Sequence, residues 1–366
     1  ANTTGDNNVA MGYQALKSNT TADNNTAIGD QALEFNTTGA NNVALGALAL
    51  DANTTGDDSV AIGYQALGAN TTGGGNIAIG SGALDANTTA IHNVGVGTNA
   101  LGGNTTGTAN VALGHRALLT NSTADNNTAV GYDSLKLNTT GASNVALGKH
   151  SLFANTTGSE NTALGLGAGE KLTTGVNNIL IGYVAGAHDV YLTTGIGNVI
   201  IGNYADTTTA DSAYANVIGY NVSGAAGYTT LGDAGSDIRA AHGTATWATV
   251  SDQRYKKDIV DSTAGLSFIN ALQPRTFKYK TLGELPETFR AYEADSTEVF
   301  KNSNTNHGFI AQEVKAAIDA DSSIADGFKL WDDRDDGSQE VAEAALIPVL
   351  VKAIQELTAR LETLEG

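Results

Sequence analysis

The chain of 366 residues contains no cysteine, 3 prolines and one methionine, and only 6% of it is aromatic and 16% charged. The absence of cysteine excludes disulfide scaffolds, thiolate zinc sites and cysteine nucleophiles. Charged residues usually make up about 25% of a globular chain. With so little charge and so few rings, much of the 41% hydrophobic fraction must be Ala, Val, Leu and Ile.

Basic residues are in the minority, with 19 Lys and Arg against 38 Asp and Glu. Binding to DNA or RNA needs clustered basic side chains that contact phosphates, so we expect no nucleic-acid partner. No run of 18 apolar residues is present, and we expect no membrane insertion. Six histidines leave little for a metal enzyme, and we expect neither a metal nor a cofactor. The first residues, ANTTGDNN, lie inside a repeat without a signal-peptide pattern, and we interpret the chain as part of a longer polypeptide.

A 17-residue repeat dominates the first part of the chain, with the consensus NTTGxNNVALGxxALxx. The NTTG motif or a close variant begins at Asn2, Asn19, Asn36, Asn53, Asn70, Asn87, Asn104, Asn121, Asn138 and Asn155. A related LTTG follows at Leu172 and, after a spacing of 20, at Leu192. A fixed short period of this kind is typical of a solenoid.

Each repeat contains one segment, such as residues 42–46, where apolar residues alternate with Ala and a Gly ends the run. This pattern predicts a strand of four or five residues. The next segment, xxAL, is too short for a helix, and NTTG has the chemistry of a turn. Because such a unit cannot bury its own apolar side chains, consecutive units must stack. We predict a rod of about 50 Å for eleven rungs, stabilised by Asn and Thr ladders and by columns of Val, Ile and Leu.

The strand sequence N-S/N-V-A-L/I-G resembles the head repeats of trimeric autotransporter adhesins and the shafts of phage tail fibres. The resemblance covers about residues 1–235 and implies a trimeric β-solenoid or β-roll. The period of 17 residues departs from the commoner adhesin spacing, which leaves the number of strands in each turn open.

Two other interpretations of the repeat are weaker. Asn-Thr-Thr matches the acceptor pattern for N-glycosylation, but we favour a structural turn with stacked Asn side chains. Asp6, Asp23, Asp57 and Asp58 fall in the same turn and could bind calcium. Since no acidic residue recurs in every copy, we expect no calcium ion on each rung.

The composition changes near residue 250. Residues 1–250 carry 6 basic and 17 acidic residues, whereas the last 116 residues carry 13 and 21 and contain all three prolines. We therefore divide the chain into a repetitive β-rod at 1–235, a linker at 236–250 and a second domain at 251–366.

The second domain opens with a serine and a lysine five residues apart, Ser251 and Lys256. A neutral lysine can act as the base for a serine nucleophile. Neither a helix nor a strand brings residues at this spacing together, so a turn, a bulge or a neighbouring chain would be required. The spacing alone favours an ordinary polar loop.

Four motifs of this domain resemble the C-terminal intramolecular chaperone of endosialidase-type phage tailspikes and tail fibres. They are SDQRYKKDI, LQPRTFKY, HGFIAQEV and the terminal LIPVLVKAIQELTARLETL. The resemblance implies a domain that trimerises the chain, folds the fibre ahead of it and then cuts itself off. It places the nucleophile at Ser251, the general base at Lys256 and the scissile bond between Val250 and Ser251, and we expect an accessory role for His307.

The other polar residues of these motifs are expected to have structural tasks. Gln312 and Glu313 would order a trimer interface or cap a helix at residues 314–318. Structural or positioning roles fall to the remaining residues of the first motif, Asp252, Arg254, Lys257 and Asp258.

The end of the chain carries apolar residues at heptad spacing, namely Ile347, Leu350, Ile354, Leu357, Leu361 and Leu364. This 3-4-3-4-3 pattern predicts a coiled-coil seam. Fewer than three heptads are marginal for an isolated coiled coil, so a single amphipathic helix packed on its own domain remains an alternative. The resemblance points to three chains.

We therefore predict a mainly β protein, a homotrimeric rod followed by an α+β chaperone domain that ends in a coiled-coil helix. We expect a structural part of a phage tail fibre or spike, made in the host cytoplasm, carried by the virion and facing a glycan or protein receptor. Its enzymatic activity would be one self-cleavage in each chain, without action on other substrates. A bacterial surface adhesin and a polysaccharide-degrading tailspike are the alternatives, although the repeat offers no recurrent carboxylate pair for the latter.

Overall fold

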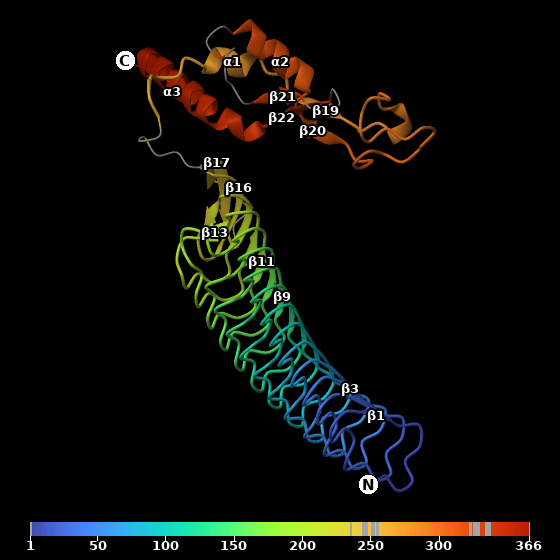
Figure 1. Ribbon diagram of the computed structural model, residues 1–366. Coiled ribbons are helices and arrows are strands. Elements are labelled where there is room, and N and C mark those ends of the chain that lie inside the picture. Colours follow the sequence, from blue (N-terminus) through green and yellow to red (C-terminus); the bar gives the residue numbers. More distant parts are fainter. Residues whose placement is uncertain are drawn as a thin grey trace. The chain divides into compact units, whose positions relative to one another are not determined.

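The computed structural model describes residues 2–234, 236–243, 248–249, 253, 256–321, 324, 330–333 and 338–365. The chain divides into two compact units, Ala1–Ser251 and Asp252–Gly366, and each is described by itself (Figure 1). Within the described residues, no helix is long and apolar enough to cross a membrane.

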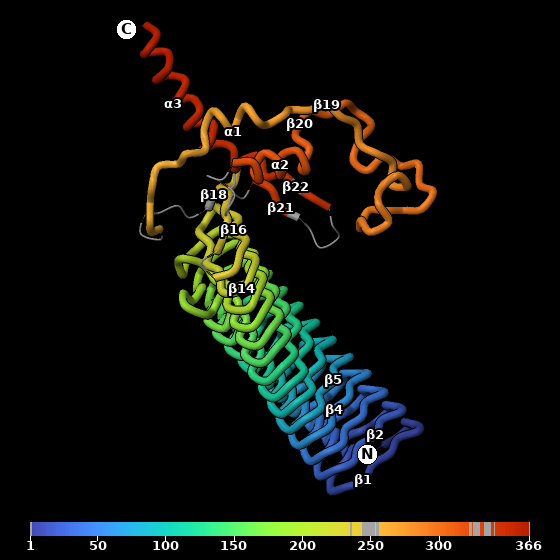
Figure 2. Tube along the Cα trace, turned by 90° about the horizontal axis from the view of Figure 1, so that it is seen from above, coloured from blue at the N-terminus to red at the C-terminus, as the bar shows by residue number. Residues whose placement is uncertain are grey.

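The first unit is a β-solenoid in which each repeat forms one coil with one short strand (Figure 2). Strands of successive coils pair in parallel and in register, so that Val43 lies opposite Val60 and Ala44 opposite Ala61. The parallel strands are β1 (Val9–Met11), β2 (Thr26–Ile28), β3 (Val43–Leu45), β4 (Val60–Ile62), β5 (Ile77–Ile79), β6 (Val94–Val96), β7 (Val111–Leu113), β8 (Thr128–Val130), β9 (Val145–Leu147), β10 (Thr162–Leu164), β11 (Ile179–Ile181), β12 (Val199–Ile201), β14 (Asn216–Tyr220) and β16 (Tyr228–Asp233). The predicted β-solenoid with a 17-residue period is confirmed.

The sheet ends in antiparallel strands. β17 (Ser236–Ala241) pairs with β16, and β18 (Ala248–Thr249) pairs with β17, so the segment predicted as a linker contributes to the sheet. A separate parallel pair is formed by β13 (Asp206–Thr207) and β15 (Ser223–Gly224).

The repeat strands are three residues long, shorter than the predicted four or five. Asn42, directly before β3, is fully buried, and its Nδ2 donates a hydrogen bond to the carbonyl of Gly56 at 2.8 Å. Gly46, directly after β3, has a φ of +142°, and a Cβ there would come within 2.4 Å of the carbonyl oxygen of Gly63. The chain therefore leaves the extended conformation at both ends of the strand.

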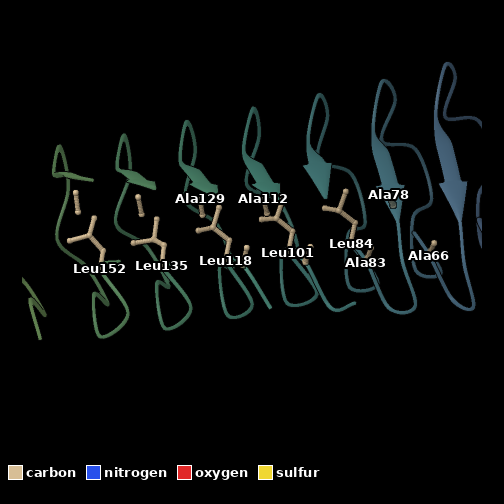
Figure 3. Packing of buried hydrophobic residues seen from close by; sticks show 14 of the residues in the cluster. Ala66, Ala78, Ala83, Leu84, Leu101, Ala112, Leu118, Ala129, Leu135 and Leu152 are labelled. Carbon is tan, nitrogen blue, oxygen red and sulfur yellow. The ribbon is translucent and has the colours of Figure 1, made fainter. Parts of the chain in front are cut away.

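The core also differs from the prediction. In strands β2 to β12 the central residue is buried and the flanking Val, Ile, Leu or Thr faces outward, as in β4, where Ala61 is fully buried and Val60 and Ile62 are not. The interior columns consist instead of these central alanines and of the leucines of the xxAL segment, among them Leu101 and Leu118 (Figure 3). Small residues fill the interior because opposite walls of so narrow a coil lie close together.

Hydrogen-bonded ladders of polar side chains connect successive coils, as predicted. Asn104 is fully buried, and its Nδ2 donates to Asn87 Oδ1 at 3.2 Å and to the carbonyl of Gly107 at 2.9 Å. Thr105 Oγ1 donates to the carbonyl of Ser122 in the next coil at 2.9 Å. A buried, hydrogen-bonded Asn side chain is no glycan acceptor in this fold, which supports the structural interpretation of NTTG.

The second unit has an α+β fold with a small core. Phe268, Val314, Ile318, Leu330 and Val349 are among the buried residues that form it. Its elements are α1 (Leu266–Ala271), β19 (Arg275–Phe277), η2 (Leu282–Glu284), β20 (Asn306–Gly308), α2 (Ala311–Ala320), β21 (Trp331–Asp333), β22 (Gln339–Val341), η3 (Glu343–Ala345) and α3 (Leu346–Glu365). β19 pairs with β20 and β21 with β22, both antiparallel.

Candidate functional site

The predicted cleavage site falls at the junction of the two units. Val250 and Ser251 lie outside the described residues, as do Asp252 and Arg254 of the same motif. Lys256 is described and exposed, and its backbone N–H donates to the carbonyl of Gln253 at 3.0 Å. The assignment of Ser251 and Lys256 as nucleophile and base therefore stays a prediction.

Two motifs that are distant in the sequence, with the paired residues Thr276 and His307 31 positions apart, meet in space through the β19–β20 pair. Thr276 of LQPRTFKY lies opposite His307 of HGFIAQEV. Beside them Arg275 Nε and Nη2 donate to the two carboxylate oxygens of Glu313 at 2.9 and 2.7 Å. This bidentate ion pair lowers the pKa of the Glu313 carboxyl group and raises the pKa of Arg275. It joins α2 to the strand pair.

Glu313 therefore has a different local role from helix capping. It lies in the first turn of α2, which begins at Ala311 and ends at Ala320, beyond both ends of the predicted helix at 314–318. Ile310 occupies the N-cap without a side-chain hydrogen bond. A carboxylate in the first turn also interacts favourably with the positive end of the helix dipole.

His307, the predicted accessory residue, is exposed at the centre of β20, with Nδ1 at 3.3 Å from Thr276 Oγ1. It lines a cleft of about 1230 Å³ together with aromatic side chains that include Phe277, Tyr279 and Phe300. The rings of Tyr279 and Phe300 meet edge to face, with centroids 5.9 Å apart. No distance between His307 and the predicted cleavage site follows from the described residues, so its accessory role stays a prediction.

The C-terminal helix α3 has two apolar faces. Leu346, Val349 and Ala353 are buried in the second unit. The other face holds the predicted heptad residues, which are all exposed, from 43% for Leu350 to 84% for Leu364. Packing on the helix's own domain and a free heptad face, which the sequence presents as alternatives, therefore coexist in one helix.

A contact that sequence reasoning missed holds α3 against α1. Glu356 Oε2 accepts a hydrogen bond at 2.9 Å from the backbone N–H of Leu266, the first residue of α1. The N-cap of α1 is Gly265, which has no side chain to supply this acceptor. The sequence shows a glycine where a capping residue is expected, but nothing local indicates a partner 90 residues away.

No candidate metal centre appears in the described part of the chain, where no three His, Asp or Glu side chains are grouped closely enough to hold an ion. The acidic turn residues make structural contacts instead. Asp57 Oδ1, for example, accepts the backbone N–H of Ala40 in the preceding coil at 2.7 Å.

The described residues thus form a β-solenoid of stacked coils and a small α+β unit whose last helix has an exposed apolar face. Residues 251–321 match the model of the family described as chaperone of endosialidase. The match includes the first three motifs and ends before α3. Comparisons with curated proteins and with solved structures gave no match. The family match indicates a self-cleaving chaperone domain, and with the β-solenoid it indicates a phage tail-fibre-like protein.

Proposed function

We propose that this chain is a shaft segment of a phage tail fibre or spike that serves in host attachment. Residues 251–366 hold three chains together while their solenoids form, and then cleave the bond between Val250 and Ser251. The released rod remains on the virion. The observation that carries the proposal is the apolar face of α3, exposed in the single chain and spaced as a coiled-coil seam.

The outer face of the solenoid sheet supports an assembly of several chains. Its strands present two columns of mostly Val, Ile and Leu, with exposures of 52% for Val9, 47% for Leu147 and 42% for Ile218. A soluble single chain rarely exposes so long a continuous apolar surface, whereas interfaces between chains are built from such surfaces. We infer that strand faces of neighbouring chains cover one another in the mature rod.

The proposed cleavage is an acyl shift followed by hydrolysis. Ser251 Oγ attacks the carbonyl carbon of Val250 while the neutral amine of Lys256 accepts the hydroxyl proton. The C–N bond then breaks, the proton passes to the departing amine of Ser251, and an ester joins Val250 to Oγ. Water hydrolyses this ester and leaves a carboxylate on Val250 and a free hydroxyl on Ser251. Each chain is cut once because the nucleophile belongs to the bond that is cut.

Cleavage in this proposal waits for assembly. A lysine acts as a base only when burial or a neighbouring cation favours its neutral form, and Lys256 is exposed in the single chain. A neighbouring chain that covers this segment would supply the burial. Cleavage would then remove residues 251–366 only after the three chains have been aligned.

The test is expression of the full chain and of Ser251→Ala, followed by denaturing gels, mass spectrometry and light scattering. We expect the wild type to yield two fragments separated between Val250 and Ser251, and the variant to remain one chain of 37.3 kDa. The assembled variant should have three times that mass.

Two matched controls replace a serine and a lysine of the same unit that the proposal does not use. Ser262→Ala and Lys280→Ala, the second chosen because Lys280 lies outside all four motifs, should cleave as the wild type does, whereas Lys256→Ala should not. An uncut wild-type chain, a cut at another bond, or full cleavage of Ser251→Ala would disprove the proposed chemistry. A monomeric mass would disprove the clamp.

A further inference from the structure

The basic residues of the solenoid are concentrated at one place. Residues 1–250 contain six Lys and Arg against 17 acidic residues, and three of the six lie in three successive coils. These three are Arg116, Lys136 and Lys149, which follow strands β7, β8 and β9. They lie in the turns after the strands and not on the apolar strand faces.

The repeat brings these side chains together from neighbouring coils. A single buried carboxylate, that of Asp133, is 5% exposed and accepts hydrogen bonds from Arg116 Nε at 2.8 Å and Nη2 at 2.9 Å. Lys136 Nζ lies 3.4 Å from Oδ2 of the same carboxylate. Asp133 thus fixes two cations in place before any ligand arrives, which lowers the entropy cost of binding.

Aromatic rings complete the surface. The Tyr132 hydroxyl accepts a hydrogen bond from Arg116 Nη2 at 2.8 Å, and the Tyr132 ring stacks on His115 with centroids 5.2 Å apart. Lys149 Nζ lies 5.7 Å from the centroid of the Tyr132 ring. Farther along the axis Lys136 Nζ lies 5.3 Å from the Phe153 ring, and His150 connects the Tyr132 and Phe153 rings. We call these residues, 115, 116, 132, 133, 136, 149, 150 and 153, the basic cluster.

The basic cluster holds three cations and one carboxylate, and its net charge is positive on a solenoid that is acidic elsewhere. Lys149 is exposed and has no carboxylate partner in the described part of the chain. Stabilisation of the rod does not require such a cluster, because other coils stack in the same register with the uncharged residues Gln65, Gly68 and Ala47 at the positions equivalent to Arg116, Lys136 and Lys149. The Arg116 and Lys136 side chains are 31% and 18% exposed, so they too are accessible in part to solvent. Accessible cations in acidic surroundings concentrate a ligand with spaced negative charges.

We propose that the basic cluster binds an anionic polysaccharide whose sugars carry carboxylate or phosphate groups. Strands of successive coils lie about 4.8 Å apart, so cations carried by three successive coils are distributed along the axis of the solenoid, which suits a linear polymer. Duplex DNA carries one charge per about 1.7 Å, and the acidic coils on either side would repel so dense a polyanion. The inference rests on the proposed role in host attachment and names the chemistry of the receptor.

The experiment measures binding of the full chain to immobilised polygalacturonate, phosphomannan, neutral dextran and duplex DNA at 50 and 200 mM salt. We expect binding to the carboxylated or the phosphorylated polymer, and the one that binds identifies the anion. Binding should weaken with salt because the contacts are ionic. The double variant R116Q/K149Q should bind at least tenfold more weakly.

The matched control is K17Q/K171Q, which removes two cations from other coils and should bind as the wild type does. Lys149→Gln alone is a second variant, since Lys149 is not bonded to Asp133 and its loss leaves the buried ion pair intact. Equal binding of R116Q/K149Q and wild type, equal binding to dextran, or tighter binding to DNA would overturn the proposal. So would the absence of binding to both anionic polymers.

Cleavage and oligomeric mass are measured on the same samples. A chain that cleaves and assembles but binds neither anionic polymer disproves the basic cluster as a receptor site and leaves the proposed function standing. A chain that does not assemble disproves the proposed function instead.

Discussion

Buried asparagine side chains connect one coil to the next. The amide group suits this position because it donates and accepts at once, so each Asn can bond both to its own turn and to the Asn of a neighbouring coil. A hydroxyl or a carboxylate at the same place would leave one of these bonds unmade. An unpaired polar group in the interior costs about 1–3 kcal/mol.

Asn104→Ala should therefore destabilise the solenoid by about 1–3 kcal/mol, since it removes the donor to the buried Asn87 Oδ1 and one of the two partners of both Asn121 Nδ2 and the Gly107 carbonyl. Denaturant unfolding followed by circular dichroism measures the change. Thr106→Ala is the control, because the Thr106 side chain is exposed in the same turn. Equal denaturation midpoints for Asn104→Ala and Thr106→Ala would contradict a stabilising role of the Asn ladder.

Carboxyl groups that are half-buried along the rod make its stability depend on pH. Burial raises the pKa of Asp85, so the folded state favours the protonated form. Its contribution to stability is present below the unfolded value of about 3.9 and is lost as the pH rises through the raised folded value.

Asp85→Asn should stabilise the rod at pH 7, by no more than about 1 kcal/mol because the group is only half-buried, and should have no effect at pH 3. Denaturation midpoints at the two pH values provide the measurement. Asp30→Asn, which changes an exposed carboxyl group of the same rod, should change neither midpoint. A larger gain at pH 3 than at pH 7 would reverse the sign and refute the argument.

At the scale of elements, the leucine turn of each coil combines strain with burial. Leu101 has a φ of +53°, a conformation that costs a non-glycine residue about 1–2 kcal/mol. Full burial of its side chain stabilises by about 1.5–3 kcal/mol, which offsets the strain. The turn persists because the leucine column of the whole solenoid supports it.

The helix α3 is the element on which assembly depends in our proposal. Ile354→Glu places a charge in the exposed apolar face, at 62% exposure, and leaves the buried residues Leu346 and Val349 in place. We expect a monomer that keeps its helix content and loses self-cleavage, measured by light scattering, circular dichroism and gels.

The neighbouring substitution Gln355→Glu introduces the same charge at an exposed polar position and should assemble and cleave normally. A trimeric, cleaved Ile354→Glu protein would show that the seam does not hold the chains together. A monomer that still cleaves would separate cleavage from assembly.

At the scale of the whole molecule, our proposal has the C-terminal unit act during assembly and the solenoid persist afterwards. Strand pairing between distant parts of several chains is slow, and exposed strand edges can pair in the wrong register. A clamp that aligns the chains lowers this barrier. After its removal the rod would be held by a high unfolding barrier.

Once denatured and diluted, the cleaved rod should therefore not recover its structure, whereas uncleaved Ser251→Ala should refold. Recovery of β-structure and trimer mass after removal of guanidinium measures both. Matched denaturation times and concentrations serve as the control. Equal recovery of the two proteins would contradict a chaperone role for residues 251–366.

The repeat was predictable in most respects because its information is local. Period, strand position, turn chemistry and the Asn ladder all follow from a pattern that recurs within 17 residues. The direction of the strand side chains did not follow, since alternation alone does not say whether Ala61 or its neighbours Val60 and Ile62 face inward. The ion pair of Arg275 and Glu313 could not be predicted either, because it depends on how α2 and the strand pair meet.

By itself the sequence determined a stacked β-rod, a change of architecture near residue 250 and an apolar seam at the C-terminus, because periodicity and composition are properties of the chain. Only the tertiary structure decided which faces are buried. It placed Ala and Leu in the narrow interior and Val and Ile outside, assigned α3 one buried and one exposed apolar face, and gathered Arg116 and Lys136 around Asp133. The physical reason is that burial depends on the space between elements that are distant in sequence, and no local pattern encodes that space.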